Sequence, residues 1–143
     1  MKIYRIAQEV IEEPQNEEVG PEAVEVMPPV LYHGTDAESS MSNSLKEHLN
    51  KIKQHGLGAP NVIVDKTFDG SKTGVVYLTG NLERAIYYAN VRSLSGGTAV
   101  LEVNTQYLDK NQLFVDENTT DPFSYEYHGV IPSSALKVIK EQP

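Results

Sequence analysis

The sequence predicts an α+β fold in which split, mostly antiparallel β-sheets are combined with two main helices. Short apolar segments rich in β-branched and aromatic residues are separated by glycine-containing turns, as is typical of strands. Two longer segments instead repeat their apolar residues at helical spacing. Because strands and helices are interleaved irregularly, the pattern favours an α+β architecture.

Composition bounds the class of protein. The chain has 143 residues, of which 39% are hydrophobic, and this suits one domain with a real core. The net charge of −8 argues against a protein that coats nucleic acid. The absence of cysteine excludes a disulfide framework, a thiolate metal site and a cysteine nucleophile. No apolar run has the length of a membrane span or the form of a secretory signal, so we expect a soluble, cytoplasmic protein without a membrane partner.

Residues 1–29 are predicted to be an acidic flexible tail. Residues 3–11 have apolar side chains at helical spacing, which predicts a short amphipathic helix. The following residues are rich in Glu and Pro, which is typical of an extended or disordered linker. This region carries −5 of the net charge. It is either a docking peptide for a protein partner or a plain solvated extension.

Residues 30–143 are predicted to be the folded domain. It opens with a strand at 30–33 that ends at Gly34 and Thr35. A helix is expected over 39–55. Its apolar residues share one face: Met41, Leu45, Leu49 and Ile52.

The middle of the domain begins at Gly56. This glycine is predicted to end the preceding helix by adopting the left-handed backbone conformation of a C-cap. A long loop over 58–74, with one short extended piece at 62–64, is of the kind that often forms a functional lid. An apolar run at 75–78 then predicts a buried strand.

A second helix should follow that strand at once. Asn81 is the expected N-cap, Glu83 lies in the first turn, and apolar residues recur at helical spacing through Ala89. On this helix Tyr88 flanks the apolar stripe and can lean toward Tyr77 at the strand end. The two rings either grip a flat ligand ring from both faces or are half-buried packing residues.

The last third of the chain predicts three more strands. They lie at 99–103, 124–131 and 135–139, with a break at Pro132 between the last two. Residues 104–118 are expected to be a turn-rich crossing. Its predicted anchors are Tyr107, Leu108 and Leu113.

A group of polar and aromatic residues follows the predicted strands. His33 closes the first strand, and Gly34 lets the backbone approach a ligand closely. Tyr77 lies within the second strand and Tyr88 eleven residues later. Glu126 lies in a late strand. In this order the His-Gly-Thr strand end, the two tyrosines and the glutamate resemble the ADP-ribosyltransferase fold, in the His-Tyr-Glu branch that includes diphtheria-toxin-like enzymes and poly(ADP-ribose) polymerases.

The resemblance covers residues 30–140 and implies transfer of ADP-ribose from NAD+, the co-substrate, to a macromolecular acceptor. His33 would hydrogen-bond a ribose hydroxyl and, with Gly34 and Thr35, set the position of NAD+. Tyr77 and Tyr88 would sandwich the nicotinamide ring. A further implied contact is that of Glu126 with the ribose beside nicotinamide, where a carboxylate stabilises an oxocarbenium-like charge. This chemistry needs no metal and no covalent nucleophile.

Several other residues compete for these roles. Glu117 and Asp121 are near enough in sequence to replace Glu126 as the acid, and Glu126 itself could be a surface residue of an edge strand. His128 is either an accessory polar group or a solvent-facing strand residue. His48 and His55 lie seven residues apart on one helix face, and a pair of histidines without a third ligand favours packing over a zinc site. The two arginines of the domain, Arg84 and Arg92, either reach a pyrophosphate or are solvated.

Other functions remain compatible with the same fold. They are an NAD+-dependent RNA 2'-phosphotransferase, an NAD+ glycohydrolase, and a domain that only binds ADP-ribose-like ligands or a protein. A phosphotransferase site is rich in Arg and His, whereas the domain contains only two arginines, Arg84 and Arg92. The acceptor, protein or nucleic acid, and the role as toxin, phage-encoded modifier or housekeeping enzyme stay open.

Overall fold

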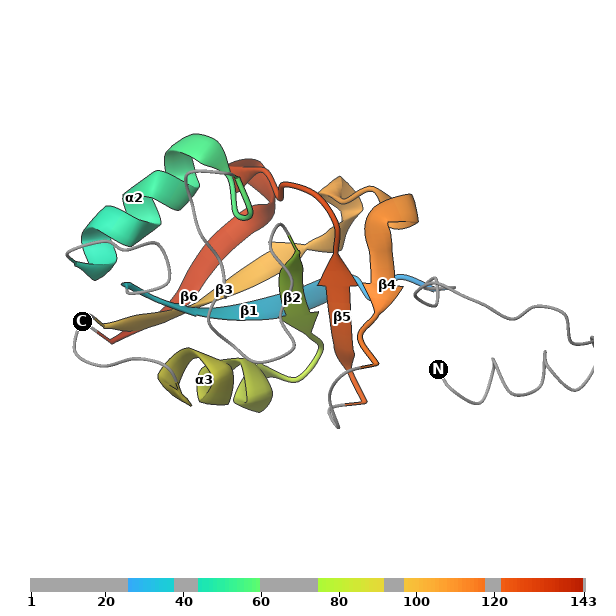
Figure 1. Cartoon of the computed structure of the whole chain (residues 1–143), viewed down its shortest axis with the longest axis horizontal. Helices are drawn as coiled ribbons and strands as arrows, with labels where there is room; N and C mark the ends of the chain where they lie inside the picture. The colour runs from blue at the N-terminus through green and yellow to red at the C-terminus, as the bar shows by residue number, and fades with distance from the viewer. Residues whose placement is uncertain (1–25, 38–43, 60–74, 92–96, 118–121, 143) are drawn as a thin grey trace, which may run out of the picture.

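The computed structural model describes residues 26–37, 44–59, 75–91, 97–117 and 122–142. These residues form one six-stranded, antiparallel, open sheet with two α-helices, in the strand order β4-β5-β2-β1-β3-β6 (Figure 1). The predicted α+β class is confirmed. The strands are β1 (Val30–Asp36), β2 (Val76–Thr79), β3 (Thr98–Asn104), β4 (Leu113–Val115), β5 (Ser124–Tyr127) and β6 (Leu136–Gln142). The helices are α2 (Leu45–His55) and α3 (Leu82–Val91), and the 3₁₀ turns are η2 (Thr105–Tyr107), η3 (Lys110–Gln112) and η4 (Ser133–Ala135).

The sheet has two halves that meet at β1 and β2. All seven residues of β1 pair with β3, and β3 pairs in turn with β6. On the other edge, β1 pairs with β2 through Tyr32 and Thr79 alone, whereas β2 pairs with β5 along its whole length. Figure 1 shows β2, β5 and β4 running across the direction of β1, β3 and β6. The β1–β2 junction is therefore the narrowest link in the sheet.

Four strands differ from the sequence prediction, and one of them is β6, which runs to Gln142 rather than ending at 139. β1 continues past its predicted end to Asp36, because β3 pairs with every residue up to that position. β4 lies inside the stretch predicted as turns, since Leu113–Val115 is too short a run to show strand periodicity. β5 ends at Tyr127 rather than at Ile131, which makes only an isolated bridge with Leu57.

α2 begins later than predicted. Ser44 has extended backbone angles (φ −153°, ψ 162°) and its hydroxyl accepts a hydrogen bond from the Glu47 N–H, so Ser44 is the N-cap. At the other end Gly56 has a positive φ of 88°, as a glycine C-cap requires, but its ψ of 159° is not left-handed helical. The Gly56 N–H donates to the Ile52 carbonyl and closes the last turn.

α3 follows β2 directly, as predicted. The Asn81 side-chain oxygen accepts hydrogen bonds from the backbone N–H of Glu83 at 2.9 Å and of Arg84 at 3.3 Å. Asn81 is therefore the N-cap. The helix packs on β1 so closely that a Cβ at Gly34 would lie 2.0 Å from the Ala85 carbonyl oxygen. Only glycine allows this approach.

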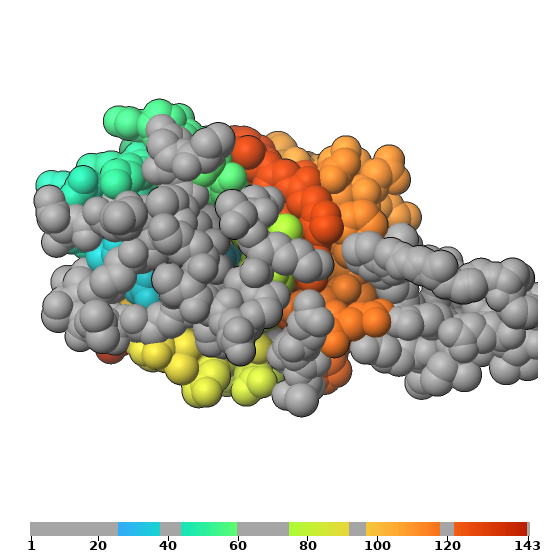
Figure 2. All heavy atoms as spheres, in the orientation of Figure 1, coloured from blue at the N-terminus to red at the C-terminus, as the bar shows by residue number. Residues whose placement is uncertain are grey.

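The two helices cover opposite faces of the β1–β3–β6 half (Figure 1). Strand alternation directs His33 and Thr35 toward the face that carries α2, and Gly34 lies against α3 on the other face. In the space-filling view, atoms of β1 are seen between α2 and α3 (Figure 2).

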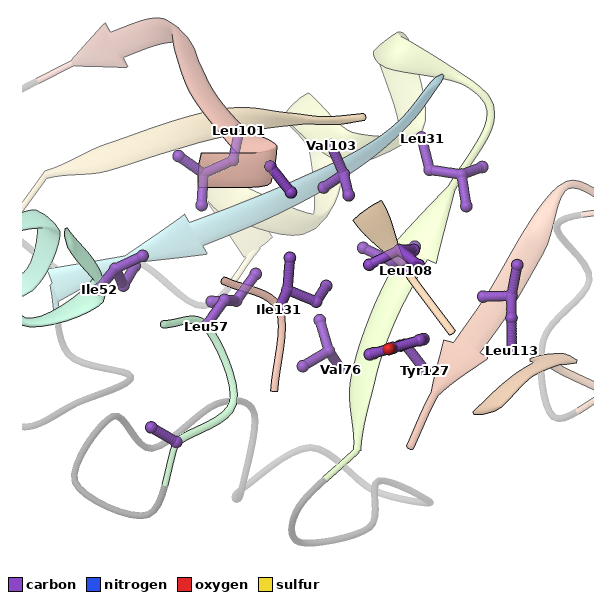
Figure 3. Packing of buried hydrophobic residues seen from close by; sticks show 13 residues of the cluster. Leu31, Ile52, Leu57, Val76, Leu101, Val103, Leu108, Leu113, Tyr127 and Ile131 are labelled. Carbon is purple, nitrogen blue, oxygen red and sulfur yellow. The ribbon is translucent and has the colours of Figure 1, made fainter. Parts of the chain in front are cut away.

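The hydrophobic core lies on the α2 side of the sheet and joins both halves (Figure 3). Its buried members include Leu31, Ile52, Leu57, Val76, Leu78, Leu101, Val103, Leu108, Leu113, Tyr127 and Ile131. The predicted anchors Leu108 and Leu113 are confirmed, whereas Tyr107 is 51% exposed and is not an anchor. Full burial of each such side chain stabilises the fold by roughly 1.5 to 3 kcal/mol.

The folded part begins before Val30. Met27 packs against the core, and the carbonyls of Pro28 and Pro29 accept hydrogen bonds from the hydroxyl and the N–H of Thr105. The predicted helix at 3–11 and the loop with its extended piece at 62–64 lie outside the described residues. Within the described part of the chain, no helix is long and apolar enough to cross a membrane.

Candidate functional site

The two edges of β1 use its backbone differently. The Ala37 N–H donates to the Gly97 carbonyl, and the Thr105 N–H donates to the Pro29 carbonyl. In the β1–β3 register these bonds assign the odd-numbered residues of β1 to hydrogen-bonded pairs with β3. The even-numbered residues, including Gly34, therefore direct their N–H and C=O groups toward β2.

Gly34 lies just beyond the point where the pairing between β1 and β2 ends. The next β2 residue along the register from the Tyr32–Thr79 pair is Tyr77, yet Gly34 and Tyr77 are not a ladder pair. Gly34 remains partly exposed although β1 is a central strand. The backbone donor and acceptor of Gly34 thus point into the β1–β2 junction.

His33 contacts β2 at the same junction. Its Nδ1 lies 2.8 Å from the backbone carbonyl oxygen of Tyr77. Because a carbonyl only accepts, Nδ1 must carry the proton, and in the neutral ring Nε2 is then an acceptor. The side chain of His33 thereby holds a β2 carbonyl that lies beyond the single β1–β2 pair.

Thr35 is braced by α2. The hydroxyl of Thr35 and Nε2 of His48 are 2.7 Å apart, and both residues are buried. Burial, and to a smaller extent the nearby charges of His33 and Lys51, lower the pKa of His48 to about 4. His48 is therefore neutral at pH 7 and has a structural role, as the packing interpretation predicted, while His55 is exposed.

Tyr77 and Glu126 are brought together by the β2–β5 register, in which they are direct partners. Direct partners in an antiparallel pair project from the same face with their Cβ atoms about 4.5 to 5.5 Å apart. Glu126 is 3% exposed, so its interpretation as a surface residue is wrong. It lies between β4 and β2 because β5 is an inner strand, with the missed strand β4 as the edge.

Glu126 also contacts His128, which lies two residues later and just past the end of β5. His128 Nε2 lies 2.9 Å from Glu126 Oε1. The His128 ring lies against Phe114 of β4, with 4.7 Å between ring centroids. Phe114 is the register partner of Glu126, and the sequence analysis did not single it out. The only signal for it was the short run Leu113–Val115.

His33 does not project from the same face of the sheet as Tyr77 and Glu126. Alternation assigns Tyr77 and Glu126 to the face on which α3 lies, and His33 to the face of α2. The His33 ring is instead turned into the junction, where it reaches the Tyr77 carbonyl. A ligand that contacts all three residues would have to enter the β1–β2 junction rather than lie flat on one face.

Tyr88 makes its observed ring contacts within α3. The Arg84 guanidinium lies 5.4 Å from the centroid of the Tyr88 ring and 5.5 Å from that of the Tyr87 ring. The two tyrosine rings meet edge to face at 5.8 Å. The sandwich of nicotinamide between Tyr77 and Tyr88 stays a prediction.

The competing acids are placed differently from Glu126. Glu117 is exposed and lies beyond the end of β4, and Asp121 is outside the described residues, as is Arg92. Asp116 is a buried acid that the sequence analysis missed, and it accepts a 3.0 Å hydrogen bond from the Ser124 hydroxyl. This bond joins the ends of β4 and β5.

No group of three or more His, Asp or Glu side chains suited to a metal ion occurs among the residues that the structure describes. Comparison with models of known protein families finds no match. Comparison with curated proteins finds no relative either. The resemblance to ADP-ribosyltransferases therefore stays a prediction from the motif order.

Proposed function

We propose that this protein transfers ADP-ribose from NAD+ to a macromolecular acceptor and releases nicotinamide. The observation that carries the proposal is the direct pairing of Tyr77 with Glu126 beside a junction in which Gly34 has no ladder partner on β2. An aromatic ring, a buried acid and a backbone donor–acceptor pair then lie on three neighbouring strands. We also infer that the β1–β2 junction is the split of the sheets that the sequence predicted.

The junction is suited to the nicotinamide end of NAD+. A primary carboxamide carries one donor and one acceptor side by side, which complement the N–H and C=O of Gly34. The tyrosine faces of Tyr77 and Tyr88 would attract the cationic ring. Thr35, held by His48, would support the strand end that carries these groups.

His33 would position a ribose of NAD+. Its Nδ1–H is directed to the Tyr77 carbonyl, so Nε2 of the neutral ring is the atom that would accept a hydrogen bond from a ribose hydroxyl. The same bond fixes the tautomer and the direction of the ring. His33 would thus contact the ribose through Nε2 and β2 through Nδ1, and so fix the position of the sugar relative to β2.

Glu126 would stabilise the transition state. Cleavage of the bond between the ribose C1' and the nicotinamide nitrogen leaves positive charge on the sugar, and the electron pair departs with nicotinamide. A carboxylate that is 3% exposed interacts with such a charge more strongly than one in water. Removal of a comparable electrostatic contact typically slows an enzyme by about 100- to 1,000-fold.

The test compares Glu126→Gln with Glu117→Gln, a matched change at the competing exposed acid. Purified protein is incubated with NAD+ labelled on the adenylate, in a cell lysate, and nicotinamide release and labelled macromolecules are both measured. We expect Glu126→Gln to lose label transfer by about 100-fold or more and Glu117→Gln to retain it. Full transfer by Glu126→Gln would contradict the assigned role.

The same assay separates the other functions. Protease or nuclease treatment identifies the acceptor as protein or nucleic acid. Free ADP-ribose formed without lysate would indicate a glycohydrolase, and NAD+ binding without nicotinamide release would indicate a binding domain. Deletion of residues 1–25 tests whether the tail recruits the acceptor. It spares Pro28 and Pro29, whose carbonyls bond Thr105.

A further inference from the structure

Glu126 of β5 and His128, which follows the end of this strand, form a glutamate–histidine pair at the candidate site. His128 Nε2 and Glu126 Oε1 are 2.9 Å apart. The Glu126 side chain is 3% exposed, whereas the His128 side chain is 31% exposed. The pair therefore runs from the interior, at Glu126, to the protein surface, at His128.

The contacts of His128 define its tautomer. A carboxylate only accepts hydrogen bonds, so Nε2 carries the proton toward Glu126 and Nδ1 of the neutral ring holds a lone pair. Phe114 packs against the ring, and the backbone N–H of His128 donates to the Gln112 carbonyl at 2.9 Å and fixes the position of the residue. A buried carboxylate that orients a more exposed imidazole is the arrangement of a general base.

We propose that His128, oriented by Glu126, takes the proton from the attacking atom of the acceptor. This inference rests on the proposed function. The acceptor oxygen or nitrogen forms a bond to the ribose C1', the bond from C1' to nicotinamide breaks, and its electron pair leaves on neutral nicotinamide. The acceptor proton moves to His128 Nδ1, where the imidazolium is paired with Glu126, and then passes to solvent.

The consequence is a preference for one chemical class of acceptor. Hydroxyl and N–H groups must lose a proton when they attack, so they need the base. Anionic nucleophiles such as azide carry no proton and do not need it. The acceptor is thus predicted to be a group that carries a proton on its attacking atom.

The first test uses His128→Gln, because the glutamine amide nitrogen can stand where Nε2 does and keep the bond to Glu126. The variant lacks the Nδ1 base. With NAD+ in water containing methanol, we expect formation of ADP-ribose and of its methyl glycoside to fall about 100-fold or more. With added azide, the glycosyl azide should form at the wild-type rate.

His55→Gln is the matched control, since His55 is exposed on α2 and far along the chain from this pair. It should leave all three products unchanged. Thermal unfolding of both variants shows whether they are folded. Wild-type rates of hydrolysis and methanolysis in His128→Gln would overturn the inference, and so would an equal loss of the azide product.

The second test is chemical rescue of His128→Ala. Removal of the ring leaves space beside Phe114, and free imidazole can occupy it and take the acceptor proton. We expect free imidazole to raise the rate of NAD+ hydrolysis by His128→Ala at least about tenfold. If His128 were merely structural, imidazole would not change this rate. If wild-type protein releases no nicotinamide at all, the proposed function fails; if only these His128 effects are absent, the present inference alone fails.

Discussion

The two edges of β1 are built in different ways. Toward β3, all seven residues of β1 are paired, and the odd-numbered ones supply the backbone hydrogen bonds. Toward β2, a single residue pair is followed by the bond from the His33 imidazole to the Tyr77 carbonyl.

The difference shows how one strand can serve both stability and binding. Backbone groups in a complete ladder are satisfied and cannot bind a ligand without breaking the sheet. Backbone groups beside an incomplete ladder can. The β3 edge therefore fixes the position of β1, and the β2 edge is the part suited to recognition.

The largest effect is expected from Gly34→Ala. The new Cβ would lie 2.0 Å from the Ala85 carbonyl oxygen and 2.8 Å from the Ala89 nitrogen, both backbone atoms. Overpacking of this kind costs about 1 to 3 kcal/mol and here should exceed that range. Chemical denaturation measures the loss.

Gly80→Ala is the control, because the nearest atoms to its Cβ lie at 3.5 Å or more. Its free energy of unfolding should stay within about 0.5 kcal/mol of wild type. Equal losses in the two variants would show that α3 does not press on Gly34.

The next effect is a dependence of stability on pH through His48, which contacts the Thr35 hydroxyl. Burial lowers the pKa of His48 to about 4 in the folded state, against 6.5 in the unfolded chain. Between these values the unfolded state binds more protons, so stability from neutral His48 is complete above about pH 6.5 and is lost as the pH falls toward 4. The loss amounts to about 3 kcal/mol.

His48→Gln tests this expectation, because glutamine can keep a bond to Thr35 but does not titrate in this range. Denaturation midpoints of both proteins are measured from pH 7.5 to 4. The free energy of unfolding of the wild type should decline more steeply than that of the variant. Parallel curves would mean that His48 is not held neutral by the fold.

A smaller effect is expected at the β2 edge itself. His33→Ala removes the donor to the Tyr77 carbonyl and should cost about 1 to 3 kcal/mol. His33→Asn should recover part of this loss, because its amide nitrogen can stand where Nδ1 does. Both variants should lose NAD+ binding, measured by calorimetry, since neither has the Nε2 acceptor. Equal stability of the two variants would contradict the bonding role of Nδ1.

The smallest difference is expected in the unmodified protein. Amide hydrogen exchange should protect Leu31, His33 and Thr35, which face β3, more than Gly34, which faces the junction. We expect protection factors that differ by about tenfold, and NAD+ should reduce the difference. Equal protection at Gly34 before NAD+ is added would indicate a closed junction.

Local pattern was sufficient for most elements of this fold. Apolar runs identified β1, β2 and β3, and Asn81 marked the start of α3. The start of α2 was placed too early, because helical periodicity alone does not show where a cap such as Ser44 interrupts it. β4 was missed since its three residues are ordered by pairing with β5 rather than by their own pattern.

The candidate site depended less on pattern. Sequence order singled out His33, Tyr77 and Glu126, but the bond from His33 to the Tyr77 carbonyl joins residues 44 apart. The pairing of Tyr77 with Glu126 follows from the β2–β5 register. The hydrogen bond between Glu126 and His128 was not predicted, because it depends on the direction of the His128 ring, which packs against Phe114 of β4.

By itself the sequence determined the fold class, the N-cap of α3 and the side chains available for chemistry, since these follow from residue type and local spacing. Only the tertiary structure decided which backbone groups of β1 remain outside a ladder, and which histidine is buried and which is exposed. These properties depend on strand register and burial, which arise from contacts between residues distant along the chain. The chemistry open to His48 and to His128 differs for that reason alone.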